Sequence, residues 1–190
     1  MSFLRPPSIV GTTFMINGSF HIGDKVVYPN RGVGIIEQIG NRTMGATVEK
    51  FYLLNIKSSS LKVMVPFEKV ASVGLRRVVR NGEIQKIVDF LTDGECNNNS
   101  DWKYRFKENS ERMGTGSLLE VAAVLKSLLL LSQSKPLSFR EKKMLERARY
   151  LLVSELAVAK NCAEAHIEEM LSKALSKSSL RFPEASEFQA

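Results

Sequence analysis

Two patterns of hydrophobic positions divide the chain near residue 80. From Lys25 to Leu75, the runs KVVY, VGIIEQI, KFYLLNI and LKVMVP are separated by the turn signals PNRG, GNRTMG and KSSS. Short runs rich in Val, Ile, Tyr and Phe at this spacing are typical of antiparallel strands. About five short strands cannot form an open sheet with a good core, so the pattern predicts a small, strongly bent barrel of the SH3 or Tudor type.

After Asn81 the hydrophobic period becomes that of a helix. Apolar residues at positions 84, 87, 88 and 91 share one face, and Gly94 ends the segment. Four further segments show the same period, and two of them begin with a Ser–Glu capping box. These segments are SDWKYRFKENSERMG, SLLEVAAVLKSLLLL, SFREKKMLERARYLLVSELAVAKN and CAEAHIEEMLSKAL. The sequence therefore predicts a compact bundle of about five helices after the barrel.

The predicted fold class is α+β with two domains, a small N-terminal β-barrel and a C-terminal helical bundle. Both ends of the chain carry Ser and Pro without a hydrophobic period, which predicts flexible extensions. The expected boundaries are a flexible extension over 1–19, a barrel over 20–72, a linker over 73–80, a helical domain over 81–175 and a flexible tail over 176–190.

Composition narrows the class of partner. The 190 residues are 44% hydrophobic and 25% charged, which is ordinary for a soluble globular protein. The net charge of +7 favours an anionic partner, either nucleic acid or an acidic protein surface. Pro6 and Pro7 interrupt the N-terminal segment, so no signal peptide is predicted. The leucine run 128–131 is too short to span a bilayer, and we expect a cytoplasmic protein with no membrane partner.

Catalytic motifs are missing from the sequence. It has no GxxxxGK[ST] loop, GxSxG elbow or HExxH helix. Cys96 and Cys162 are far apart and His21 and His166 are isolated, so neither a zinc site nor a disulfide framework is predicted. We therefore expect a binding protein without catalytic residues, cofactor or metal, rather than an enzyme.

The single tryptophan follows a polar loop in NNNSDWKYRFKEN. On a helix starting there, Trp102 shares a narrow sector with Phe106 and Met113, and Lys103 and Lys107 form a neighbouring basic strip. Core burial is one reading of this pattern. The other is an apolar wedge beside cations that hold a phosphate backbone. The pattern alone leaves both open.

Three segments resemble a known family: GDKVVYPNRGVG, the DW…YRFK helix start, and LSFREKKMLERARYLLVSELAVAK. They are similar to the CarD/CdnL family of bacterial RNA polymerase-binding transcription factors, and the similarity covers about residues 20–175. The resemblance implies a Tudor-like domain that docks on the β subunit of RNA polymerase. It also implies a helical domain that approaches promoter DNA at the upstream edge of the transcription bubble, where Trp102 wedges into the minor groove without sequence specificity.

The resemblance also assigns roles to single residues. Arg42, in GNRTMG, matches the polymerase-contacting arginine of the family. Met64, in LKVMVP, stands where some members have arginine, which suggests a more apolar polymerase contact here. Lys107 and Lys142 match basic positions near DNA. To these DNA-binding candidates we add Lys103 and Arg105, because of their charge and their proximity to Trp102.

The expected function is to stabilise the open promoter complex, since a wedge binds melted DNA better than closed duplex. One alternative is a protein-interaction adaptor that does not bind DNA, with the tryptophan as a hot spot or core residue. A weaker alternative is an RNA-binding module, although the paired aromatics of a stacking platform are missing. We expect a monomer, with a homodimer through the barrel as the alternative.

Overall fold

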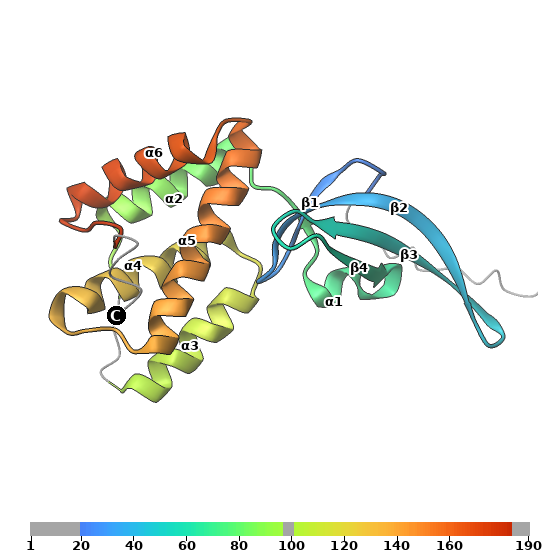
Figure 1. Ribbon diagram of the computed structural model, residues 1–190, viewed down its shortest axis with the longest axis horizontal. Coiled ribbons are helices and arrows are strands. Elements are labelled where there is room, and N and C mark those ends of the chain that lie inside the picture. Colours follow the sequence, from blue (N-terminus) through green and yellow to red (C-terminus); the bar gives the residue numbers. More distant parts are fainter. Residues whose placement is uncertain (1–19, 97–100, 184–190) are drawn as a thin grey trace, which may run out of the picture.

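The computed structural model describes residues 20–96 and 101–183, with only the backbone described at Met44 and Trp102. Figure 1 shows two units arranged along the long axis, one of strands and one of helices. The strands are β1 (Lys25–Tyr28), β2 (Gly32–Met44), β3 (Thr47–Ile56), β4 (Leu61–Pro66) and β5 (Arg76–Arg77). The helices are α1 (Val70–Val73), α2 (Asn81–Asp93), α3 (Trp102–Gly114), α4 (Leu118–Ser134), α5 (Phe139–Lys160) and α6 (Glu164–Lys177).

The described residues thus contain six α-helices, one more than the sequence predicted. The extra helix is α1, a single turn that follows the short 3-10 helix η1 (Phe67–Lys69) beside the sheet. Its four residues, VASV, are too few to show a helical period. The five helices α2 to α6 form the C-terminal unit, at the positions that the hydrophobic pattern indicated.

The sheet is antiparallel with the order β4-β3-β2-β1-β5. Among the described residues β4 and β5 do not pair with each other, so the predicted barrel is an open, bent sheet. Its core is one face of the strands, closed over by Phe20, Val70 and Leu75. Phe67 stacks on Tyr52 with ring centroids 4.2 Å apart. These side chains cover the apolar face that a closed barrel would cover with its own strands.

The segment predicted as a linker contains the last strand. Arg76 and Arg77 pair with Val27 and Val26 of β1. The sheet unit therefore extends to Arg77, and only a few residues separate it from α2.

Helix α4 forms the centre of the helical unit and is buried along most of its length. Its Leu125, Leu128 and Leu129 belong to one core with residues of α2, α5 and α6. Leu180, inside the predicted C-terminal tail, is also buried in this core. The remainder of that tail, 184–190, and the predicted extension 1–19 lie outside the described residues. No helix in the described part of the chain is both long and apolar enough to span a bilayer.

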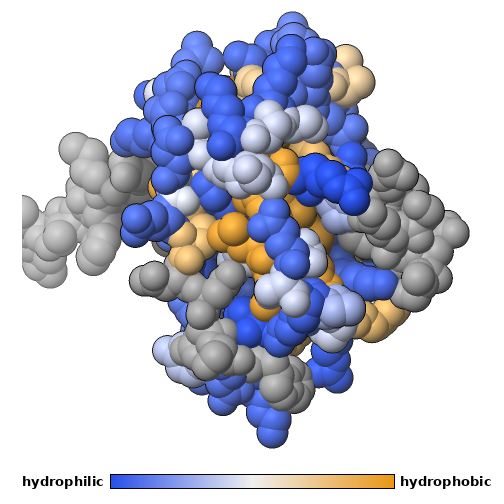
Figure 2. Space-filling model, turned by 90° about the vertical axis from the view of Figure 1, so that its left-hand side faces the viewer, coloured by the Kyte–Doolittle hydropathy of each residue, from blue (hydrophilic) through white to orange (hydrophobic). Residues whose placement is uncertain are grey.

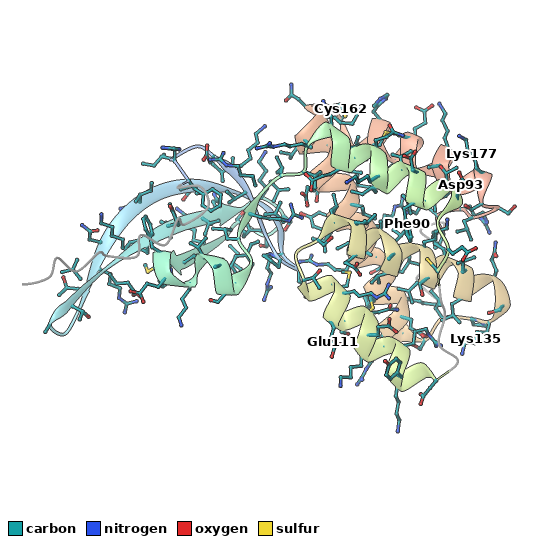
Figure 3. The ribbon with its side chains drawn as sticks, turned by 180° about the vertical axis from the view of Figure 1, so that it is seen from behind. Phe90, Asp93, Glu111, Lys135, Cys162 and Lys177 are labelled. Carbon is teal, nitrogen blue, oxygen red and sulfur yellow. The ribbon has the colours of Figure 1, made fainter. Side chains whose placement is uncertain are left out.

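A buried lysine completes the packing of the helical unit. Nζ of Lys126 donates to the carbonyl oxygens of Phe90 and Leu91, each at 2.9 Å, and so caps the last turn of α2. Figure 3 labels Phe90 and Asp93 at that end of α2. Burial lowers the pKa of Lys126, and the three hydrogen bonds, including one to Ser178 Oγ, satisfy its ammonium protons.

A buried carboxylate joins the two units. Glu155 of α5 is 2% exposed and accepts two hydrogen bonds from Arg76 of β5, at 2.5 and 2.9 Å. It also accepts one from the backbone amide of Val79, at 3.0 Å. Farther along α5, Nη2 of Arg147 donates to the carbonyl oxygen of Asn30 at 2.6 Å. The sheet unit is therefore held on α5 at several points.

Candidate polymerase and nucleic-acid surfaces

Arg42 and Met64, the two predicted polymerase contacts, lie on the same face of the sheet. Arg42 pairs with Glu49 and Met64 pairs with Leu53 across neighbouring ladders. Glu49 and Leu53 are an even number of residues apart on β3, and residues at such positions point to the same side of a strand. This is the side opposite the buried Tyr52 and Leu54, so Arg42 and Met64 share the outer face of the sheet.

Aromatic and aliphatic side chains separate these two residues on the outer face. Phe51 and Leu53 are half-buried, and Met64 is 44% exposed. Gly40 pairs with Phe51, and a Cβ at position 40 would lie 2.9 Å from the ring. The missing side chain therefore gives the ring room to lie across β2. Lys62, which pairs with Asn55 across the ladder and with Glu37 in an ion pair, is a second exposed cation on this face. The outer face thus combines positive charge with a partly apolar surface.

The start of α3 carries the predicted DNA contacts. The side chain of Asp101 accepts a hydrogen bond from the amide of Lys103 at 2.9 Å and caps the helix. Trp102 is the first residue of α3, and its side chain lies outside the described residues. Lys103 is exposed, and so is Lys107, whose Nζ is 3.9 Å from Glu111, the residue labelled on α3 in Figure 3. Both lysines present their charge at the surface near the helix start.

Arg105 does not lie on that surface. Its side chain is 3% exposed, and Nη2 donates to Oε1 of Glu141 at 2.9 Å. It follows Trp102 by three residues, on the face of α3 that also buries Asn109. The prediction that Arg105 contacts DNA, which rests on charge and proximity to Trp102, is therefore wrong. The burial of Arg105 leaves it no charge to offer a phosphate in this conformation, and it joins α3 to α5 instead.

Glu141 is held by α5 as well as by Arg105. Its Oε2 accepts from the amide and the hydroxyl of Ser138, at 2.9 and 2.7 Å, in a capping box at the helix start. Burial alone would raise the pKa of Glu141, but the hydrogen bonds from Ser138 and Arg105 outweigh it and the pKa is lowered. The carboxylate is therefore charged at neutral pH and fixes the first turn of α3 against the first turn of α5.

Lys142 follows Glu141 but faces another part of the surface. It lines a hollow of about 480 Å³ with Leu129 of α4, Leu137 between α4 and α5, and Leu180 after α6. Figure 2 views this end of the helical unit and shows apolar residues surrounded by hydrophilic ones. The structure thus places Lys103 and Lys107 together on α3. Lys142 lies apart from them on α5, where it lines the hollow and follows Glu141 of the buried ion pair.

Residues that the sequence analysis did not single out lie beside this junction. Phe139 is 74% exposed at the start of α5 and is followed by the exposed Arg140 and Lys143. The segment Ser138–Arg140 repeats the order of Asp101–Lys103, in which a capping residue precedes an aromatic residue and a cation. This repeat was the signal that could have identified them.

Comparison with known proteins agrees with both units. The model of the CarD-like/TRCF RID domain matches residues 20–79, and the model of the CarD C-terminal domain matches residues 86–172. A relative from Bacillus subtilis (strain 168), named "Putative transcription factor YdeB", is 35% identical over 149 residues. The match covers 78% of this chain and 97% of the Bacillus protein.

Proposed function

Because the chain belongs to the CarD/CdnL family of transcription regulators, we propose that it binds the β subunit of RNA polymerase through its sheet and promoter DNA through its helical unit. In this proposal it stabilises the open promoter complex by inserting Trp102 into the minor groove at the upstream edge of the bubble. It acts as one copy, in the cytoplasm, and without a base-specific code.

The observation that carries the DNA-binding half is the fixed position of the α3 start. A wedge acts on DNA only if its backbone does not yield, and the buried pair between Arg105 and Glu141 holds the helix one turn after Trp102. Lys103 and Lys107 are exposed on the same helix and, as one basic strip, suit phosphates beside the inserted ring. This combination of an aromatic residue at a fixed helix start and neighbouring cations supports a minor-groove wedge.

The wedge changes an equilibrium through differential affinity. A ring inserted at a step whose stacking is already lost avoids the cost of unstacking, so it binds melted DNA better than closed duplex. A difference of about 1.4 kcal/mol between the two states would change the ratio of open to closed complexes about tenfold. No covalent step is required, which fits a chain in which no catalytic motif was found.

The outer face of the sheet supports the polymerase half of the proposal. Arg42 offers a cation near the end of the long β2–β3 hairpin, and Met64 offers an apolar contact on the edge strand β4. A partner surface with a carboxylate and an apolar patch would complement both. The replacement of a family arginine by Met64 makes this contact less ionic than in relatives that keep the arginine.

Promoter opening by the cognate polymerase tests the proposal. The assay uses a fluorescent reporter on a weakly melting promoter and compares the wild type with Trp102→Ala and with Leu119→Ala, an exposed apolar residue on α4. We expect the wild type and Leu119→Ala to raise the open fraction and Trp102→Ala to fail, with all three equally folded. If Trp102→Ala works equally well, the wedge is wrong. If no protein changes opening, the adaptor function is favoured.

A further inference from the structure

The exposed ring of Phe139 has no role in the function proposed so far. Phe139 is the first residue of α5, and its neighbour Ser138 caps that helix through the bonds to Glu141. The backbone below the ring is therefore fixed, although the ring itself is 74% exposed. A single exposed apolar residue is common on protein surfaces, so a contact here is inferred from the groove and the cations beside the ring.

Phe139 stands at one end of a groove between α3 and α5. The groove has a volume of about 460 Å³ and is lined by Phe106 and Met113 of α3 and by Met144 of α5. Met113 is buried, and Phe106 and Met144 are half-buried, so the floor is apolar. Such a floor beside an exposed ring suits a flat apolar face.

Cations of α5 form one wall of this groove. Arg140, Lys143 and Arg147 lie three and four residues apart and follow one stripe of the helix. Arg147 is engaged with the carbonyl oxygen of Asn30, and Lys143 pairs with Glu146 and lies 5.9 Å from the ring of Phe139. Arg140 is exposed, and its side chain forms no hydrogen bond or ion pair within the part of the chain that the structure describes. The wall thus offers positive charge beside the exposed ring.

The same junction brings the groove close to the proposed wedge. Glu141, two residues after Phe139, pairs with Arg105, three residues after Trp102. The two helix starts that carry an aromatic residue are therefore tied together within one turn of each residue. A molecule bound at the start of α3 would lie near the start of α5.

We propose that Phe139 and the groove between α3 and α5 bind one unpaired nucleotide of the melted DNA, with the base on the Phe139 ring and its phosphates at Arg140 and Lys143. This inference rests on the proposed function, because it needs melted DNA at the start of α3. A basic groove with an aromatic ring on which a base stacks is the usual design of a site for single-stranded nucleic acid. It takes any base, since every base has a flat π-face.

An acidic peptide is the other partner that cations would attract, and the arrangement favours it less. A peptide anchor would bury its side chain in a pocket, whereas the ring of Phe139 is 74% exposed and is itself the apolar group offered to a partner. Exposed cations also occur on α3, at Lys103 and Lys107, so both helices carry exposed positive charge near their starts. A continuous charged backbone such as DNA matches that distribution better than a short peptide does.

Binding to a forked duplex tests this site. The probe carries 2-aminopurine at the first unpaired position, and the matched closed duplex has the same sequence. We compare the full-length wild type with Phe139→Ala, Phe139→Leu and Phe139→Tyr, and with Trp102→Ala. Because Phe139 is exposed, its variants are expected to fold, and circular dichroism checks this.

We expect Phe139→Ala to weaken fork binding roughly tenfold, the effect of losing one stacked base, and to leave binding to the closed duplex unchanged. Phe139→Tyr keeps the ring and restores both affinity and 2-aminopurine quenching, while Phe139→Leu restores neither. If Phe139→Ala binds the fork like the wild type while Trp102→Ala does not, the nucleotide site is wrong and the wedge stands. If the wild type binds the fork no better than the closed duplex, both the nucleotide site at Phe139 and the Trp102 wedge are wrong. Loss of polymerase binding in Phe139→Ala with unchanged fork binding would identify the groove as a protein interface and overturn the proposal.

Discussion

Nη2 of Arg105 lies 2.9 Å from Oε1 of Glu141, and this ion pair is almost completely buried, with 3% and 7% of the two residues exposed. It joins α3 to α5 through two residues that are 36 positions apart in sequence. A buried pair gains little net free energy over apolar residues of the same shape, because both charges lose their hydration. Loss of only one partner leaves an uncompensated buried charge, and that is costly.

Arg105→Met should therefore destabilise the helical unit strongly. We expect it to lower the free energy of unfolding by about 3 kcal/mol, measured by urea denaturation. The double variant Arg105→Met/Glu141→Leu should lose less than the single variant, since no charge remains buried. Lys107→Met, on the same helix but exposed, is the matched control and should change stability by less than about 0.5 kcal/mol. If the loss of unfolding free energy in the double variant equals the sum of the losses in Arg105→Met and Glu141→Leu, the two residues are not coupled.

Acid should weaken this junction. The pKa of Glu141 is lowered from its ordinary value of 4.5, so its contribution to stability is present above that value and is lost as the pH falls through the lower, folded value. The pKa values of Asp24 and Glu37 are lowered too, so protonation of these carboxylates also reduces stability as the pH falls. We expect Tm to fall as the pH is reduced from about 6 to about 3, and to fall less steeply in Glu141→Gln. If Tm falls equally steeply with pH in the two proteins, Glu141 does not contribute to the loss of stability in acid.

Lys107 should contribute to DNA affinity through counterion release. Lys107→Ala is expected to weaken binding to fork and closed duplex alike and to reduce the slope of log K against log salt by about 1. The control is Lys173→Ala on α6, an equally exposed lysine that pairs with Glu169. Fluorescence anisotropy across a salt series measures the affinity and the salt slope of each variant. An unchanged slope in Lys107→Ala would mean that this lysine contacts no phosphate.

The outer face of the sheet should be the face that polymerase contacts. Met64→Glu and Arg42→Ala are each expected to weaken binding to the isolated β subunit at least tenfold, because one introduces a charge at an apolar contact and the other removes a cation. Val48→Glu is the control, since Val48 is exposed on β3 but points to the opposite face. If the control weakens binding as much as Met64→Glu, the contact is not confined to the outer face.

Local signals in the sequence identified most of the elements. Ser117 and Ser138 begin α4 and α5 as their capping patterns predicted, and the four apolar runs before Leu75 are β1 to β4. β5 carried no such signal, because it consists of two arginines. It forms because Val26 and Val27 offer a ladder to pair with. The length of β2 beyond Gly40 was hidden for a similar reason, since Asn41 to Thr43 are polar on both faces.

The candidate site was harder to predict because it depends on contacts between distant residues. The charge of Arg105 predicted a surface position. Its burial depends on the carboxylate of Glu141, which lies on another helix. Arg42 and Met64 were named separately, and only the strand register shows that they share a face. Phe139 appeared to be one more apolar residue of a helix, and its exposure depends on how α5 packs on α4.

The carboxylate of Glu155 has a consequence for where the protein acts. It accepts hydrogen bonds from Arg76 of the last strand and from the amide of Val79, so a buried carboxylate of α5 holds the sheet unit on the helical unit. The outer sheet face and the starts of α3 and α5 lie at a set span from each other across the long axis (Figure 1). Under the proposed function, in which the sheet binds polymerase and the helix starts bind DNA, this span would set the distance from polymerase to the contacted base step, whatever the promoter sequence.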